Sequence, residues 1–127
     1  MTGPIDVEAT RFSNEQPLAR RVIEYVEEHY SRPISLRDVA DALGYSPAYL
    51  TSAFSRLTGT PVTAWIIRRR IRAAQHLLSD SDQRIVSVGE SVGFSDLCYF
   101  TRQFVRHIGV TPGRYRREIP SSKWSHL

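Results

Sequence analysis

The chain has 127 residues, enough for one compact domain or for two very small ones that share a core. Its hydrophobic content of 41% and charged content of 24% are those of an ordinary globular protein and exclude a disordered one. No apolar run approaches the roughly 18 residues that cross a bilayer, and the first residues lack the pattern of a signal peptide. The single cysteine, Cys98, excludes an internal disulfide and a cysteine-rich zinc site, so we expect a cytoplasmic protein without a metal or other cofactor.

The positive charge is concentrated in the second half of the chain. The net charge is +4, and from residue 60 to the end eleven Lys and Arg stand against five Asp and Glu. Between residues 15 and 59 the corresponding numbers are five and six. Such a surplus favours a polyanionic partner such as nucleic acid, but a basic surface without any partner is an equally open alternative on charge alone.

The first half of the chain predicts a leader followed by three helices. Residues 1–15 have no sustained periodicity and predict a flexible leader, and helices are predicted over 17–32, 36–43 and 47–58. The serine before each of the last two helices and the glycine after it are typical helix caps. These caps are Ser35 and Gly44, then Ser46 and Gly59. The apolar faces are Leu18, Val22, Ile23, Val26 and Tyr30, then Leu36, Val39, Ala40 and Leu43, then Leu50, Phe54 and Leu57.

The second half predicts four more helices. Thr60 introduces the longest one, over 61–79, and a last short helix begins after Thr111 and carries Tyr115. The apolar stripe of the long helix is Trp65, Ile67, Ile71, Ala74 and Leu78. No alternating stretch is long enough to predict a strand, so we expect an all-α fold of seven helices.

Between these two helices the pattern of the second and third helices recurs. Ile85, Val88, Gly89 and Val92 match Leu36, Val39, Ala40 and Leu43 at an offset of 49, and Gly93-Phe94-Ser95 matches Gly44-Tyr45-Ser46. Phe104 and Gly109 match Phe54 and Gly59 at an offset of 50, so the second copy holds one added residue. Each copy predicts a short helix, a tight turn and a second helix. This is the helix-turn-helix arrangement, whose second helix enters the DNA major groove.

The small residues Ala40 and Gly89 occupy one matching position, where they permit close approach of the two helices of each copy. Glycine inside a helix costs about 0.5–1 kcal/mol relative to alanine. The sequence therefore predicts that alanine in place of Gly89 stabilises the protein. Two packed helical hairpins without DNA would show the same pattern, so a helical protein-interaction module with an incidental basic surface is the alternative function.

The second copy resembles the C-terminal signature of the AraC/XylS transcription regulators. The resemblance rests on Ile85, Val88-Gly89, Val92-Gly93-Phe94-Ser95, Tyr99-Phe100, Phe104, Gly109-Val110-Thr111-Pro112 and Tyr115-Arg116, and "ISLRDVADALGYSPAYLTSAFSRLTG" resembles the first helix-turn-helix of that family. It covers roughly residues 17 to 118. It implies a sequence-specific regulator of double-stranded DNA, usually an activator that recruits RNA polymerase. It also implies two recognition helices in successive major-groove segments, about one turn (~34 Å) apart.

The resemblance also implies a division of the chain. We expect a leader over 1–15, a first helix-turn-helix subdomain over 16–60, a linker helix over 61–79, a second subdomain over 80–119 and a tail over 120–127. Most relatives attach a sensor domain before this one, and the sequence leaves open whether the domain stands alone or belongs to a longer parent protein.

The base-facing positions follow from the resemblance. They are Leu97, Cys98, Thr101 and Arg102 in the second unit and Ala48, Thr51 and Ser52 in the first. Arg102 can donate two hydrogen bonds to a guanine edge, with solvation or a phosphate contact as the alternative. The first-unit residues depart from the family, which often has bulkier or basic side chains there, so we expect the second unit to discriminate more. Cys98 is interpreted as a small interface residue, with redox sensing as the alternative.

Phosphate or sugar contacts are assigned to Arg37, Tyr49, Arg56, Arg106 and Arg114, with ordinary surface exposure as the alternative for each. Arg68, Arg69, Arg70 and Arg72 sweep most of a helix circumference and cannot all face one ligand. We expect salt bridges within the chain and solvation for at least two of them. The four histidines are too scattered for a metal site, and no nucleophile-histidine-acid or paired-carboxylate arrangement is present, so the sequence predicts no enzyme.

Overall fold

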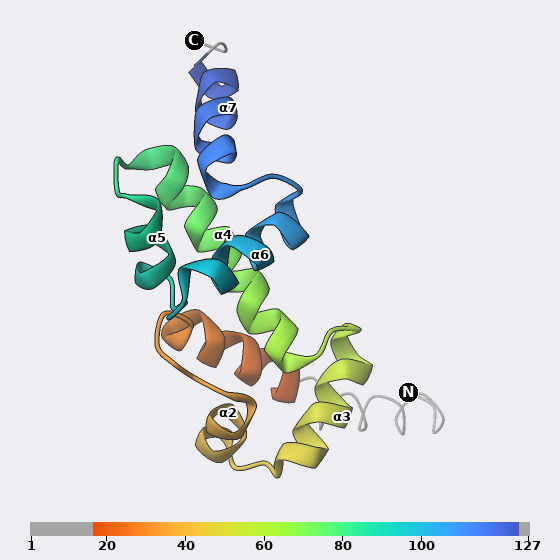
Figure 1. Cartoon of the computed structure of the whole chain (residues 1–127). Coiled ribbons are helices and arrows are strands. Elements are labelled where there is room, and N and C mark those ends of the chain that lie inside the picture. Colours follow the sequence, from red (N-terminus) through yellow and green to blue (C-terminus); the bar gives the residue numbers. More distant parts are fainter. Residues whose placement is uncertain (1–16, 125–127) are drawn as a thin grey trace, which may run out of the picture. The chain divides into compact units, whose positions relative to one another are not determined.

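The described part of the chain is entirely helical (Figure 1). The computed structural model describes the backbone of residues 17–124 and the side chains of residues 17–118, and the predicted leader lies outside them. A first helix covers residues 17–29, and six more follow within the described range. They are α2 (Leu36–Leu43), α3 (Pro47–Thr58), α4 (Val62–Asp80), α5 (Ile85–Ser91), α6 (Leu97–Ile108) and α7 (Pro112–Trp124). The predicted all-α fold of seven helices is thus confirmed over residues 17–124, where none of the helices could span a membrane.

The helices form two compact units, each with one helix-turn-helix pair. The first unit contains residues 17–29 and 34–66, and the second contains residues 30–33 and 67–124. The division falls inside α4, whose first residues belong to the first unit and whose remainder belongs to the second. The segment predicted as a linker helix is therefore a core element of both units and not a separate spacer.

The core of the first unit is built from the predicted apolar faces. Leu50 and Phe54 on α3 are fully buried, and Phe54 packs edge-on against Trp65 with ring centroids 5.6 Å apart. Leu57, which was expected to be buried, is half-buried, and Ile66 is buried although the predicted stripe of the long helix omits it. The buried residues of this unit are Leu18, Val22, Val26, Val39, Ala40, Leu50, Ala53, Phe54, Val62 and Ile66.

The core of the second unit is a chain of aromatic rings closed by aliphatic side chains. Phe100 lies between Phe94 and Phe104, with ring centroids 5.1 Å and 5.9 Å away, and Phe104 continues to Tyr115 at 5.5 Å. The aliphatic members are Ile71, Ala73, Ala74, Leu78, Val88 and Val92. Because the rings come from the turn, α6 and α7, they join the helix-turn-helix pair to the end of the domain.

The same hydrogen-bond pattern closes both helix-turn-helix turns. In the first unit, the amides of Gly44 and Tyr45 both donate to the carbonyl of Ala40, at 2.9 Å each, and Gly44 has a left-handed backbone with φ of 84°. In the second unit, the amide of Phe94 donates to the carbonyl of Gly89 at 2.9 Å. A positive φ of this kind is nearly strain-free only for glycine. The predicted caps Ser35, Ser46 and Gly59 are likewise confirmed.

The added residue of the second copy lies at the start of α6. The side chain of Asp96 accepts a hydrogen bond from the amide of Cys98 and caps this helix, whereas the corresponding cap of α3 is Ser46. Ser95, which matches Ser46 by the offset of 49, therefore lies one position before the cap. From the caps onward the two second helices correspond at an offset of 50, so Ser52 corresponds to Arg102 and Tyr49 to Tyr99.

The last helix is longer than expected. The sequence predicts a tail over residues 120–127, but α7 continues through Pro120 to Trp124. A proline inside a helix removes its own amide from the hydrogen-bond ladder and crowds the carbonyl four residues earlier, yet the backbone stays helical past Pro120. Residues 125–127 lie outside the described range.

Arginine side chains close the C-terminal ends of three helices. Arg70, one of the four arginines of which at least two were expected to be salt-bridged or solvated, is only 9% exposed and donates to the carbonyls of Tyr30 at 2.7 Å and Arg32 at 2.8 Å. Arg21 donates to the carbonyl of Leu43 at 3.0 Å, and Arg116 donates to those of Leu78 and Ser81 at 3.1 Å each. These carbonyls lie at the end of a helix or in the turn just after it, where they lack a helical partner, so the guanidinium groups satisfy them.

Phe104 is a fully buried ring of the second core, so its contribution to stability can be tested by substitution. We expect Phe104→Ala to lower the free energy of unfolding by about 3–5 kcal/mol, because it removes a ring and leaves a cavity. Urea unfolding followed by circular dichroism measures the change. Val105→Ala, next to it on the exposed side of α6, is the control and is expected to change stability little. Unchanged unfolding of Phe104→Ala would contradict the assignment.

The structure overturns the expectation for Gly89. A methyl group there would lie 2.7 Å from Cδ2 and 3.1 Å from Cγ of the fully buried Phe100 ring, so the ring would have to shift. Overpacking of this kind costs about 1–3 kcal/mol and outweighs the gain of about 0.5–1 kcal/mol in helix propensity. The corresponding residues of the first unit are Ala40 and Leu50, so the smaller residue at position 89 accompanies the larger one at position 100.

We therefore expect Gly89→Ala to lower the thermal unfolding midpoint. The double variant Gly89→Ala with Phe100→Leu copies the Ala40–Leu50 pair of the first unit. It is expected to have a higher unfolding midpoint than Phe100→Leu alone. Gly113→Ala is the matched control, because its methyl group meets only the end of Arg117 at 3.7 Å, an ordinary contact. A midpoint raised by Gly89→Ala would contradict the clash.

Candidate nucleic-acid interface

One side of α6 forms an exposed stripe of predicted contact residues. Leu97, Cys98 and Arg102 are exposed, and Arg106 continues the stripe one turn further along the helix. Positions four residues apart lie on one face of a helix, so Cys98, Arg102 and Arg106 point to the same side. Thr101, the fourth predicted base-facing residue, is half-buried at the edge of this stripe.

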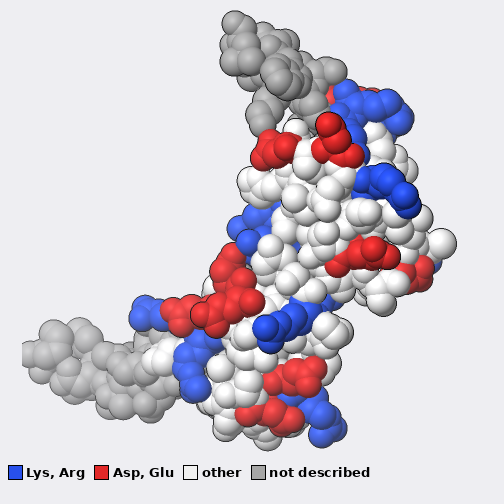
Figure 2. All heavy atoms as spheres, turned by 90° about the vertical axis from the view of Figure 1, so that its left-hand side faces the viewer, with Lys and Arg blue, Asp and Glu red and all other residues white. Residues whose placement is uncertain are grey.

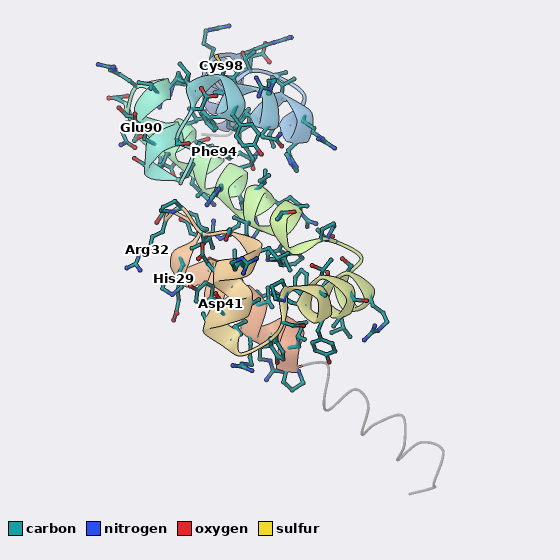
Figure 3. All side chains as sticks on the ribbon, turned by 60° about the horizontal axis from the view of Figure 1, so that its bottom comes forward. His29, Arg32, Asp41, Glu90, Phe94 and Cys98 are labelled. Carbon is teal, nitrogen blue, oxygen red and sulfur yellow. The ribbon has the colours of Figure 1, made fainter. Side chains whose placement is uncertain are left out.

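The start of α6 is held by a helix cap and by packing of its buried side against the core. The carboxylate of Asp96 accepts from the amide of Cys98 at 3.1 Å, while Phe94 and Phe100 lie in the core beneath. Figure 3 shows Cys98 on the outer side of α6, directed away from the core. The first turn of this helix is therefore presented outward by a rigid base, as recognition through its N-terminal residues requires.

Arg102 combines exposure with an ordered neighbour. Its guanidinium carbon lies 5.8 Å from the ring centroid of Tyr99, one turn earlier on α6. Within residues 17–118 it forms no ion pair with an acidic side chain. Its hydrogen-bond donors thus remain available to an external acceptor such as a base edge or a phosphate.

The corresponding face of α3 is equally exposed but chemically weaker. Ala48, Thr51 and Ser52 are all exposed, and Tyr49 beside them is 47% exposed. Ala48 offers only a methyl group, and the two hydroxyls offer single hydrogen bonds. No residue among these three can form the bidentate contact that arginine makes with guanine.

The predicted phosphate-contacting arginines differ in their surroundings. Arg37, Arg56 and Arg106 are exposed on α2, α3 and α6. Arg114 forms an ion pair with Glu118 at 2.8 Å, and this hydrogen bond, together with the charge of Glu118, raises the pKa of the Arg114 guanidinium. A phosphate would have to compete with Glu118 for Arg114.

Two further groups have shifted pKa values. Desolvation lowers the pKa of His107 below its usual 6.5, and the positive charges of Arg106 and Arg68 lower it further, so His107 is neutral near pH 7. Burial also lowers the pKa of the Arg70 guanidinium, and Tyr99 acts in the opposite direction. Arginine nevertheless stays charged, since its ordinary value lies far above neutral pH.

The charges are mixed on the face that Figure 2 shows. Asp and Glu side chains lie among the Arg side chains there, without a continuous basic surface on this view. Asp41 and Glu90, at matching places on α2 and α5, are both exposed (Figure 3). Over the described residues, no three His, Cys, Asp or Glu side chains are grouped as a metal site would require.

Sequence reasoning missed two residues of this region. Tyr99 entered only as part of a motif, yet it lies under Arg102, and the spacing of three residues between an aromatic and an arginine is the signal that would have indicated it. Asp96 was not recognised as the cap of α6, because the offset of 49 draws attention to Ser95. The offset of 50 between the downstream phenylalanines identifies Asp96 instead.

Comparison with known proteins decides the family. A family model described as "Helix-turn-helix domain" matches residues 39–118, which cover most of the first helix-turn-helix pair and all of the second. The chain belongs to the AraC/XylS-type helix-turn-helix family. The resemblance noted in the sequence is thus confirmed.

Members of this family with related sequence or structure are found in several bacteria. The regulatory protein PocR of Salmonella typhimurium is 35% identical over 79% of this chain and 33% of its own length. The C-terminal domain of AraT, a response regulator from Geobacillus stearothermophilus, is 31% identical with a TM-score of 0.77, over 80% of this chain and 84% of that one. The DNA-binding domain of AdpA, solved with a target DNA, is 28% identical with a TM-score of 0.78, over 84% of this chain and 95% of that one.

The curated relatives are longer than this AraC/XylS-type chain. It spans 33%, 40% and 42% of the lengths of PocR, the Msm operon regulatory protein of Streptococcus mutans and YobQ of Bacillus subtilis.

Proposed function

We propose that this chain binds double-stranded DNA in a sequence-specific manner and regulates transcription, with α3 and α6 as its two recognition helices. The observation that carries the proposal is the exposed stripe on α6, where the guanidinium of the exposed Arg102 lies over the ring of Tyr99. Membership of the AraC/XylS-type family and similarity to the DNA-bound domain of AdpA support it.

In this proposal the two units have unequal roles. The second unit reads bases through Leu97, Cys98, Thr101 and Arg102, and Arg102 makes a bidentate contact with a guanine. The first unit contributes methyl contacts and single hydrogen bonds from Ala48, Thr51 and Ser52, together with backbone contacts from Tyr49. Phosphate contacts from Arg37, Arg56, Arg106 and Arg114 hold both helices in register on the duplex.

The wider setting of the chain is also proposed from the family. The two recognition helices enter successive major-groove segments of one duplex, about one turn apart (~34 Å). The protein acts in the cytoplasm of a bacterium as an activator that contacts RNA polymerase, and in a longer parent protein a sensor domain precedes this one. A reporter promoter carrying the selected DNA site would test activation, and reduced expression on adding the protein would identify a repressor instead.

The salt dependence of binding separates a DNA-binding domain from a protein-interaction module. If the four arginine candidates each neutralise one phosphate, affinity for DNA is expected to fall by about a hundredfold between 50 and 200 mM salt, because bound counterions are released. Fluorescence anisotropy with a labelled duplex measures this. Arg106→Gln is expected to reduce by about one the slope of the logarithm of the binding constant against the logarithm of the salt concentration. Weak binding that does not change with salt would favour the interaction module.

Arg102 and Ser52 form a matched pair for testing sequence discrimination. The preferred site is first selected from random DNA. Arg102→Ala is then expected to weaken binding to that site by about 5- to 150-fold, equivalent to the roughly 1–3 kcal/mol of one bidentate contact, and to relax the preference at one base pair. Binding to a scrambled duplex is expected to fall far less. Ser52→Ala, at the corresponding position of α3, is expected to change little in either titration.

The two duplexes distinguish the roles of Arg102. Equal weakening of the selected and scrambled duplexes at one salt concentration would show a phosphate contact. Discrimination would then have to come from Leu97, Cys98 or Thr101.

A further inference from the structure

An arginine, an aromatic residue of the turn and a tyrosine of the recognition helix lie in contact in both units. In the first unit, the guanidinium carbon of Arg21 is 5.4 Å from the ring centroid of Tyr45, and the ring of Tyr45 is 5.8 Å from that of Tyr49. Arg21 also donates to the hydroxyl of Tyr45 at 3.1 Å. The three groups thus form a stack from the first helix to α3.

The second unit repeats this stack at the matching positions. The guanidinium carbon of Arg70 lies 5.8 Å from the centroid of Phe94, and the ring of Phe94 is 5.9 Å from that of Tyr99. Arg70 and Phe94 follow their counterparts at the offset of 49, and Tyr99 follows Tyr49 at 50 because of the residue added in the turn. The repeat therefore extends to the helix before each helix-turn-helix pair.

The lower members of the second stack are held firmly. Phe94 is only 3% exposed, and both hydrogen bonds of Arg70 go to backbone carbonyls in the segment 30–33. Gly93 makes this arrangement possible, because a methyl group there would lie 2.6 Å from the carbonyl oxygen of Tyr30 and 2.7 Å from Nε of Arg70. The half-buried ring of Tyr99 thus rests on groups that have little freedom to move.

The two stacks differ in what lies above them. Arg102 is three residues after Tyr99, and its guanidinium lies over that ring, whereas Ser52 occupies the corresponding place after Tyr49. An arginine loses substantial rotamer freedom when it binds, and a neighbour that already holds its planar group reduces this loss. An aromatic face holds a guanidinium with about 0.5–1 kcal/mol at an exposed site.

We propose that Tyr99 is a positioning residue for Arg102, which holds the guanidinium over its ring so that the donors are ordered before the base is met. This inference rests on the proposed function and adds to it a residue that governs specificity without touching DNA. The first unit has Ser52, not an arginine, at the position that matches Arg102, so Tyr49 does not have this role.

The test compares Tyr99→Leu and Tyr99→Phe, each with and without Arg102→Ala. Affinity is measured for the selected duplex and for one changed only at the base pair whose preference Arg102→Ala relaxes. We expect Tyr99→Leu to reduce the ratio of the two affinities by about two- to fivefold, the equivalent of one exposed cation–π contact. Tyr99→Phe keeps the ring and is expected to keep the ratio. In the Arg102→Ala background, Tyr99→Leu is expected to have no further effect on it.

Tyr49→Leu is the matched control, since it removes the same ring from the first stack. Because Tyr49 is assigned a backbone contact, this change is expected to weaken both duplexes alike and to leave the ratio unchanged. Circular dichroism shows whether each variant is folded. If Tyr99→Leu does not fold, Tyr99→Met replaces it, because a thioether still packs against Phe94 without an aromatic face.

Each other outcome overturns the inference in a recognisable way. An unchanged ratio in Tyr99→Leu shows that the ring does not order Arg102, and an equal further loss in the Arg102→Ala background shows that Tyr99 acts independently of it. Equal weakening of both duplexes in Tyr99→Phe shows a phosphate contact of the hydroxyl. Failure of the proposed function itself is distinct, because the wild-type protein would then bind selected and scrambled duplexes equally.

Discussion

Guanidinium groups that close the C-terminal ends of helices hold the elements of both units in place. Short helices such as α2 have few internal hydrogen bonds, and the carbonyls of their last turn need partners from elsewhere. Arg21, Arg70 and Arg116 supply them from helices distant in sequence. Arg70 also contributes to the turn before α6. Its Nε and the carbonyl oxygen of Tyr30 leave no room for a side chain at position 93, where the positive φ favours glycine as well, and its guanidinium lies over Phe94.

Arginines with such structural roles change how the charge of the chain is interpreted. The basic surplus of the second half was the first indication of a nucleic-acid partner. However, Arg70 and Arg116 donate hydrogen bonds to carbonyls of the protein, and Arg114 forms an ion pair with Glu118. The charge available to a polyanion is therefore smaller than the composition suggests, and the argument for DNA rests on the family and on the side chains that α6 exposes.

Local signals in the sequence predicted the helices well, whereas contacts between residues distant in the sequence could not be predicted from it. Caps such as Ser46 and Gly59 act within a few residues, and the apolar spacing of Leu50 and Phe54 follows from helix geometry, so both can be seen in the sequence. The burial of Arg70 depends on a carbonyl forty residues away. The exposed positions of α6 could be assigned from its buried face, but the place of Tyr99 under Arg102 needed the rotamers of both side chains.

The close approach of Gly89 to Phe100 also constrains the order in which the two repeats could diverge. Starting from a small-to-medium pair like Ala40 and Leu50, a first change to phenylalanine would meet the alanine methyl group and cost overpacking energy. A first change to glycine costs only the lower helix propensity and leaves room for the larger ring. Neither residue is neutral without the other. A path between the two pairs is therefore least costly when space is opened at position 89 before it is filled at position 100, and in the opposite direction when the ring is reduced before the methyl group is added.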